Sequence, residues 1–418
     1  MTIRITTLDN RLRIITDPMH TVETASVGAW VEVGARHEQF DLNGVSHLLE
    51  HMAFKGTARR SARAIVEEIE AVGGHLNAYT SRENTAYFAK VLKDDVPLAI
   101  DLIGDILQNS TLDQDELERE RAVVIQEIHQ ANDTPDDIVF DRFQETAFPN
   151  QPIGRPILGS AAQIKRMSRA TIKSFMDERY SCNRIVVAAA GNVDHDAFVA
   201  QAEGIFTQLP QNNPHDMDPV TYSGGDYREE RDLEQVHLVM GFDGIAHNDP
   251  DYYPLAVLST LLGGGMSSRL FQEAREKRGL VYNIYSFASS YEDGGLFGIY
   301  AGTSGTDIID LLPVICDEVK SVGATVQEDE VARARAQLKS STLMALESTS
   351  ARCEQAARQL QIYGREIPNI EVIEKIEAVD TKAVLHAANR IFASFPTIAA
   401  IGPIKNLADH DRIRDHLR

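Results

Sequence analysis

The sequence predicts an α+β protein made of two structurally similar halves, each a mixed or antiparallel β-sheet packed with helices. Three observations support this prediction. The 418 residues suffice for two or three domains, 43% of them are hydrophobic, and strands followed by blocks of helices occur twice along the chain. We therefore expect a first domain over 1–212, a linker over 213–226 and a second domain over 227–418.

Hydrophobic spacing defines the elements of the first half. Residues 24–34, 75–80 and 85–92 alternate as strands do, and 184–191 forms a short apolar run typical of a buried strand. Apolar residues recur at three and four positions, as in amphipathic helices, at about 44–54, 61–72, 95–109, 114–132, 136–147, 169–178 and 194–208.

The second half repeats this order. Residues 210–226 are dense in Pro, Asn, Asp and Gly, which places the linker there. The strands and helices that follow occur in the same order as those of the first half. They are a strand at 236–244, a helix at 251–262, a strand pair at 280–289 and 295–303, and helices at 305–322 and 328–346. The two halves share little identity, so the order of elements is what indicates duplication.

The net charge of −21 argues against binding to nucleic acid or to anionic lipid. It is consistent with a solvated acidic surface, or with an acidic wall that attracts a cationic ligand. Three widely spaced cysteines suggest neither a disulfide framework nor a thiolate zinc site. The N-terminus lacks the apolar core of a signal peptide and no apolar run approaches about 20 residues, so we expect a soluble, cytoplasmic protein without membrane insertion.

The segment His47-Leu48-Leu49-Glu50-His51 lies in the helix predicted at 44–54. Residues four apart share one helical face, so both imidazoles can reach one metal ion, and Glu50 lies beside them. Neutral imidazoles suit Zn²⁺, and a neighbouring carboxylate can take a proton from water at such a site. Two surface histidines are the alternative. The helix is mostly apolar, however, and buried histidines beside a carboxylate need a compensating partner.

A third metal ligand has to come from another segment, and the helix predicted at 114–132 offers two candidates. Glu120 and Glu127 are seven residues apart, two helical turns, and so lie on one face. Glu127 stands among apolar residues at 123–125 and 128, which favours it as the one that points inward.

Six segments resemble the pitrilysin/insulinase-type zinc peptidases, or inverzincins, and within them the processing-peptidase group, which includes the beta subunit of mitochondrial processing peptidase and its bacterial relatives. They run in family order through both halves: GVSHLLEHMAFKGT (44–57), GGHLNAYTSRENTAYF (73–88), ERERAVVIQEI (118–128), FDRFQETAF (140–148), QPIGRPILG (151–159) and GGGMSSRLFQEAREKRGLVY (263–282). Glu127 lies 76 positions after His51, where the family has its third ligand. The resemblance implies a LuxS/metallohydrolase-like duplicated fold.

The resemblance also implies a zinc metalloendopeptidase with one Zn²⁺ per chain. Its ligands would be His47, His51 and Glu127, and its general base Glu50, in agreement with the helical spacing. Glu120 matches a family glutamate close to the metal, which would orient a ligand or the site as a whole. The implied reaction is hydrolysis of a peptide bond that the metal polarises, in which Glu50 passes a proton to the leaving amine.

Four positions match the family's binding site for an extended peptide. Asn77, Ala78 and Tyr79 match an edge strand to which the substrate adds as a further strand; an ordinary sheet edge is the alternative. Phe54 matches a position that lines a pocket for an apolar side chain after the scissile bond, and a core phenylalanine is an equally good interpretation.

Asp137 and Asp141, four residues apart on a predicted helix, match acidic positions that hold a substrate arginine. Some relatives have a glutamate at the first of these positions, so the charge is kept while the reach is shorter. The resemblance therefore implies short, unfolded, basic peptides as substrates, with arginine two residues before the cut.

The second half lacks H-x-x-E-H and should bind no zinc. Arg275 and Tyr282 match an Arg/Tyr pair that completes the active site of related peptidases from the opposite wall; a helix-end arginine and a strand tyrosine are the alternative. In chains of this length that wall belongs to a second subunit, so the resemblance implies a homodimer enclosing a chamber, or a heterodimer with an inactive homologue. The alternative function is a non-catalytic scaffold like the core subunits of the bc1 complex, although none of the four zinc-site residues is lost.

Overall fold

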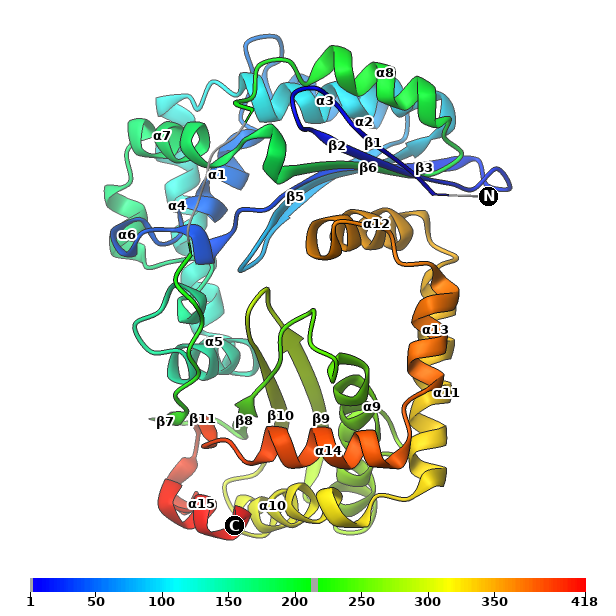
Figure 1. Cartoon of the computed structure of the whole chain (residues 1–418). Coiled ribbons are helices and arrows are strands. Elements are labelled where there is room, and N and C mark those ends of the chain that lie inside the picture. The colour runs from blue at the N-terminus through cyan, green and yellow to red at the C-terminus, as the bar shows by residue number, and fades with distance from the viewer. Residues whose placement is uncertain (1–2, 212–216) are drawn as a thin grey trace. The chain divides into compact units, whose positions relative to one another are not determined.

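The computed structural model describes residues 3–211 and 217–418, which form two compact units (Figure 1). The described residues of Met1–His129, Arg155–Asp218 and Met344–Glu366 form the first unit, and those of Gln130–Gly154, Pro219–Leu343 and Ile367–Arg418 form the second. Of the linker expected at 213–226, residues 213–216 lie outside the described residues. The units also differ from two contiguous halves, because each contains a short segment from the other half of the sequence.

The first unit is built on a six-stranded sheet in the order β1-β2-β6-β3-β5-β4. Its strands are β1 (Arg4–Thr7), β2 (Arg13–Pro18), β3 (Thr24–Val31), β4 (His75–Thr80), β5 (Thr85–Leu92) and β6 (Ile185–Gly191). Neighbouring strands are antiparallel except β2 and β6, which are parallel. Because β4 stands at one end of this order, it forms an edge of the sheet.

The second unit repeats the arrangement with a five-stranded sheet in the order β7-β11-β8-β10-β9. Its strands are β7 (Gly225–Glu230), β8 (Val236–Asp243), β9 (Val281–Ser290), β10 (Gly295–Thr303) and β11 (Thr397–Gly402). Here β7 and β11 are parallel and the other pairs are antiparallel. The order and directions match β2-β6-β3-β5-β4, which confirms the predicted duplication.

Helices cover both faces of each sheet. Those mainly in the first unit are α1 (Val45–Ala53), α2 (Ala62–Ala71), α3 (Val96–Asn109), α4 (Gln114–Asn132), α6 (Ala161–Arg166), α7 (Arg169–Arg179), α8 (His195–Ile205) and α12 (Thr349–Tyr363). Those mainly in the second are α5 (Pro135–Ala147), α9 (Tyr252–Gly263), α10 (Ile308–Thr325), α11 (Glu328–Ala345), α13 (Asn369–Glu377), α14 (Thr381–Phe392) and α15 (His410–Leu417).

Two of these helices pack on the sheet of the other half of the sequence. α12 lies on the face of the first sheet opposite to α3 and α8 (Figure 1), where Ala357 and Leu360 pack against Trp30. α5 covers a face of the second sheet through Val139 and Phe143. Each sheet has a second apolar face that a helix must cover, and this is the physical reason for the exchanged segments.

Among the described helices, none combines the length and the apolar composition needed to cross a membrane. The cysteines Cys182, Cys316 and Cys353 are all buried and unpaired, as their spacing predicted.

Candidate metal centre

Helix α1 has two faces of different chemistry. Leu48 and Leu49 are fully buried in the core of the first unit. His47, Glu50 and His51 are only partly buried and lie on the other side of the helix, as the 3.6-residue period requires. The predicted helix therefore holds its three polar motif residues together on one side.

The side chain of Glu38 fixes the N-terminus of α1. Its Oε1 accepts a hydrogen bond from the backbone N–H of Ser46 at 2.8 Å, and its Oε2 accepts from the N–H of Gly44 at 2.8 Å and from Nδ2 of Asn43 at 2.9 Å. These bonds satisfy N–H groups that the first turn of a helix leaves unpaired. Glu38 is only 3% exposed, and this burial raises its pKa to about 7 despite the three donors.

The two histidines of α1 converge with Glu127 of α4. Oε2 of Glu127 lies 3.8 Å from Nε2 of His47 and 3.4 Å from Nε2 of His51. One ligand atom from each of the three residues lies within 4.8 Å of the other two. Over residues 3–211 and 217–418, no other group of His, Cys, Asp or Glu side chains forms such a cluster.

The donor set of this cluster fits a zinc ion. Oε2 of Glu127 is buried and makes no hydrogen bond to any described residue, as expected of an oxygen reserved for a cation. Burial, together with the charge of His51, lowers the pKa of His47 to about 4, so its imidazole is neutral near pH 7, as a metal ligand must be. Two imidazole nitrogens and one carboxylate oxygen form a ligand set common in catalytic zinc sites.

Glu120 holds His51 from the side away from the cluster. Nδ1 of His51 donates to Oε2 of Glu120 at 3.0 Å, and Nζ of Lys55 lies 2.7 Å from Oε1. The side chain of Glu120 is 8% exposed, whereas that of Glu127 is 39% exposed. The expectation that Glu127 is the more inward of the two is therefore wrong. Two donors compensate the charge of Glu120, so it tolerates deeper burial.

Glu50 lies beside the cluster and is held by the last residue of β4. Oγ1 of Thr80 donates to Oε2 of Glu50 at 2.5 Å, while Oε1 has no hydrogen-bond partner within the described parts of the chain. Burial raises the pKa of Glu50 above its ordinary value, with the charge of Glu127 adding to the effect and Thr80 and His51 opposing it. A carboxylate with a raised pKa is better matched to proton transfer near neutral pH.

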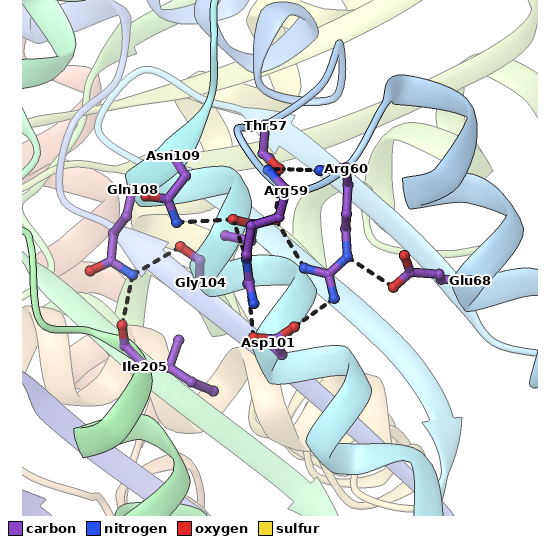
Figure 2. Close-up of polar contacts among 10 residues, drawn as sticks. Thr57, Arg59, Arg60, Glu68, Asp101, Gly104, Gln108, Asn109 and Ile205 are labelled. Carbon is purple, nitrogen blue, oxygen red and sulfur yellow. Dashed lines mark hydrogen bonds and ion pairs between the residues drawn. The ribbon is translucent and has the colours of Figure 1, made fainter.

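The segment after α1 is anchored to α3 by a network of ion pairs (Figure 2). Arg60 donates to Glu68 at 2.8 Å, to Asp101 at 2.6 Å and to Asp105 at 2.9 Å. Arg59 donates to the same two aspartates at 2.9 and 3.1 Å. This network fixes residues 59 and 60, between α1 and α2, against α2 and α3.

The positions expected to bind substrate are spread over β4 and the end of α1. Asn77, Ala78 and Tyr79 lie on β4, at the edge of the first sheet. Phe54 follows α1, is partly buried against the core and has its ring centre 6.2 Å from that of Tyr87. The edge position of the strand is the one that addition of an extended peptide requires.

The remaining predicted site residues belong to the second unit. Cζ of Arg275 lies 5.4 Å from the ring centre of Tyr282, within cation–π range, and Tyr282 is 79% exposed. Asp137 and Asp141 share one helix, α5. Burial raises the pKa of Asp137, and the charge of Asp141 adds to this effect.

Three contacts of the site were not predicted from the sequence: Lys55 with Glu120, Thr80 with Glu50, and Glu38 with the start of α1. Strand alternation carries a signal for Thr80, because it shares a face of β4 with Ala78. Lys55 follows His51 by four residues, which suggests a shared direction but not a partner. Nothing in the sequence pattern marks Glu38.

Comparison with known proteins places both units in one family. The model for insulinase (peptidase family M16) matches residues 13–161, and the model for the peptidase M16 inactive domain matches residues 166–338. The chain is 38% identical to an uncharacterized zinc protease of Rickettsia felis, over 96% of this chain and 97% of that protein. It is 40% identical to a probable mitochondrial-processing peptidase subunit beta of Arabidopsis thaliana, over 98% of this chain and 80% of that protein.

Solved structures confirm the duplicated α+β fold. A chain of Complex III2 from Candida albicans superposes with a TM-score of 0.88 at 23% identity, covering 99% of this chain and 99% of that one. A peptidase M16 inactive domain from Pseudomonas fluorescens superposes with a TM-score of 0.88 at 20% identity, covering 96% of this chain and 98% of that one. Together with the His-His-Glu cluster, these matches show that the chain belongs to peptidase family M16, the insulinase family, and is a zinc metalloendopeptidase.

Proposed function

We propose that the chain is a processing-peptidase-like endopeptidase that cleaves short, unfolded, basic peptides at the cluster of His47, His51 and Glu127, with Glu50 as general base. The observation that carries this proposal is the convergence of the three ligand candidates beside a carboxylate whose Oε1 has no hydrogen-bond partner among the described residues. A zinc ion held there supplies a Lewis acid that polarises water and the peptide carbonyl. All four residues are present, which supports a peptidase over the scaffold alternative.

The two oxygens of Glu50 have different tasks in this proposal. Thr80 holds Oε2 by its hydrogen bond, which leaves Oε1 to accept the proton of the attacking water. The same oxygen then returns this proton to the leaving nitrogen, as a general base that becomes a general acid does. The raised pKa of Glu50 supports the first of these steps, because a carboxylate that binds its proton more tightly takes it from water more readily.

Substrate would bind as an additional strand on β4. The segment Asn77–Tyr79 lies at the edge of the sheet, where outward-facing backbone groups can pair with an extended peptide. The N–H of Ala78 donates to Oδ1 of Asn77 at 2.8 Å, and a bound peptide would replace this side-chain acceptor. Folded proteins offer few extended, unpaired segments, so this mode favours unfolded peptides. Phe54 supports a pocket for an apolar side chain after the cut, since it is only partly buried.

Asp137 and Asp141 would bind the arginine two residues before the cut. The raised pKa of Asp137 beside a second carboxylate supports this role, because a guanidinium between two such groups relieves their repulsion and can bond both. The test compares peptides with arginine and with neutral citrulline at that position, for the wild type and for Asp137→Asn. The wild type should cleave the arginine peptide about tenfold faster and the variant should lose most of this difference; equal rates for both peptides in the wild type would reject the role.

We also propose a dimer in which the Arg275/Tyr282 pair of one protomer completes the active site of the other. The mutual contact of the two side chains and the exposure of Tyr282 support a pair that is available to a partner or a substrate. Relatives named as beta subunits support a multi-subunit assembly, either of two identical chains or with an inactive homologue. The cytoplasmic location stays a prediction.

A further inference from the structure

The side chains on the two faces of β4 contact different helices. Ala78 packs against the core that includes α1, and Thr80 reaches Glu50. Tyr79 lies between them in sequence and points to the other face, where it packs against α12 and donates from its hydroxyl to Oε1 of Glu354 at 3.0 Å. This alternation holds for any strand. A peptide added to β4 would therefore present its side chains alternately to the zinc helix and to α12.

Helix α12 is fixed against the first sheet, so Glu354 has a defined place beside its edge. Arg352 donates to both carboxylate oxygens of Asp17 at 2.5 Å, and the hydroxyls of Ser26 and Thr349 lie 2.9 Å apart. These contacts join the helix to β2 and β3 near the end of α12 that carries Glu354.

Glu354 has an oxygen available for a ligand. It is partly buried, and its Oε1 is bonded to Tyr79, whereas its Oε2 makes neither a hydrogen bond nor an ion pair with any described residue. Burial, with the charge of Glu354 adding to it, raises the pKa of Tyr79 to about 12, so the hydroxyl stays a donor and orients the carboxylate. An oriented carboxylate beside an open strand edge suits a cationic side chain.

The geometry of an added strand determines which substrate residue reaches this carboxylate. Side chains directly opposite each other on antiparallel neighbours have Cβ atoms about 4.5–5.5 Å apart. A substrate residue opposite Tyr79 on the α12 face would therefore extend past the tyrosine ring toward Glu354. The residues before and after it in the peptide would point toward the zinc helix instead.

We propose that Glu354 is a specificity residue that binds a basic side chain of the substrate on the α12 face, either immediately before the cut or two residues after it. This rests on the proposed function, in which the peptide adds to β4 and the residue after the cut enters the pocket at Phe54. The neighbours of that residue point to the opposite face. The arginine assigned to Asp137 and Asp141 lies two residues before the cut, so its side chain would point to the face of the added strand opposite to α12. The preference due to Glu354 and the preference due to the two aspartates can therefore be measured at different substrate positions.

Arg358, one helical turn beyond Glu354, is a competing cation. It is exposed and forms no ion pair with Glu354 within the described structure, yet its charge lowers the pKa of the Tyr79 hydroxyl slightly against the dominant effect of burial. Replacing Arg358 should remove a positive charge that competes with a basic substrate side chain for the carboxylate of Glu354. The variant Arg358→Gln should therefore strengthen the preference for a basic side chain.

The test uses quenched fluorogenic peptides that carry either arginine or neutral citrulline at each position from the third before to the third after the cut. Two positions are proposed to face α12: the one immediately before the cut and the one two residues after it. At these positions the wild type should cleave the arginine peptide about five- to tenfold faster in kcat/KM. Glu354→Gln should remove this preference there by lowering kcat/KM on the arginine peptides to that on the citrulline peptides. The control Glu347→Gln, at an exposed position just before α12, should alter the preference at no position.

Two outcomes would overturn the role of Glu354: an arginine preference that Glu354→Gln leaves intact at the α12-facing positions, or a loss that is equal at all positions. If the wild type cleaved no peptide, the proposed function would fail instead. The role of Glu354 would then be decided by binding of the same peptides to Glu50→Gln and to its double variant with Glu354→Gln, measured by fluorescence anisotropy. An arginine–citrulline difference that persists in the double variant would reject it.

Discussion

At the scale of single residues, the site depends on carboxylates whose partners differ. Glu127 has a buried oxygen without a hydrogen bond among the described residues, Glu120 has two donors, and Glu50 has one donor and one available oxygen. The proposed roles follow from these differences. An oxygen without a partner can ligate a metal, a fully bonded carboxylate can orient its neighbour, and a half-bonded one can move a proton.

The role of Glu120 predicts how zinc affinity responds to its loss. Glu120→Gln should raise the zinc dissociation constant about 10- to 100-fold, because the charged acceptor that orients and polarises the ring of His51 is replaced by a neutral amide. Lys55→Met should have a smaller effect in the same direction, since Glu120 keeps one of its donors. Competition with a chromophoric chelator measures both. Glu116→Gln on the same helix is the control, and an unchanged affinity in Glu120→Gln would show that the contact does not orient the ligand.

The burial of Glu38 predicts a pH-dependent stability. Its pKa is raised from 4.5 to about 7 in the folded protein, so the folded state binds more protons than the unfolded state between these values. The stabilisation is complete below about pH 4.5 and is lost as the pH rises through 7, by roughly 3 kcal/mol at most.

Urea unfolding of the zinc-free protein between pH 5 and 8 measures this effect. The variant Glu38→Gln cannot titrate at this position. The free energy of unfolding of the wild type should therefore fall relative to that of the variant as the pH rises. A difference between the two proteins that stays constant over this range would contradict the assignment.

At the scale of elements, local pattern predicts bounds well and long-range packing poorly. The strands predicted at 75–80 and 85–92 and the helix at 114–132 appear with those bounds, because alternation, helical period and turn residues are local properties. The partner of α12 was not predictable in this way. Its apolar positions indicate that one face is buried, but the covering surface comes from strands more than 150 residues earlier in the chain.

The candidate site shows the same division. Helical spacing alone brings His47, Glu50 and His51 together, and the spacing of seven residues places Glu120 and Glu127 on one face. The relative burial of the two glutamates was not predictable, because the lysine that compensates Glu120 comes from the chain beyond α1. Side-chain partners of this kind depend on tertiary structure, to which sequence periodicity is blind.

The packing of α12 on the first sheet is testable through the single tryptophan of the chain. Trp30 is 2% exposed and packs in the same cluster as Ala357, which is fully buried. Ala357→Glu places a charge in this apolar contact and should detach the helix, because an unpaired buried carboxylate is strongly unfavourable. The fluorescence emission of Trp30 should then shift to the red and become more accessible to acrylamide. Arg358→Glu, at an exposed position of α12, should leave the emission unchanged; a buried tryptophan in both variants would contradict the packing.

At the scale of the whole molecule, the two duplicated units carry different candidate functional residues. Both units share one strand order, yet the cluster of metal-ligand candidates lies in the first and the Arg275/Tyr282 pair lies in the second. The exchanged helices α5 and α12 make each sheet depend on the other half of the sequence for one of its covers. The acidic residues that give the chain its negative net charge thus include solvated side chains and the specific carboxylates proposed to bind a basic peptide.

The proposed completion of the active site between protomers predicts complementation. Glu50→Gln and the double variant Arg275→Ala/Tyr282→Phe should each be nearly inactive as separate proteins. After mixing and subunit exchange, a mixed dimer would combine an intact Glu50 from one chain with an intact Arg/Tyr pair from the other. Peptide cleavage should therefore reappear in the mixture. No recovery, with exchange verified by a labelled subunit, would show that the pair does not act across a dimer of this chain.

The most direct test of the account measures zinc content and peptide cleavage together in the wild type and in Glu50→Gln. Both proteins should contain about one zinc per chain, since Glu50 lies beside the ligands and is not one of them. Only the wild type should cleave a quenched basic peptide, and the rate should fall by about 10²-fold or more in the variant, because the variant lacks the carboxylate proposed to move the proton. Equal cleavage by the two proteins would contradict the mechanism, and a wild-type chain that binds no zinc would contradict the site.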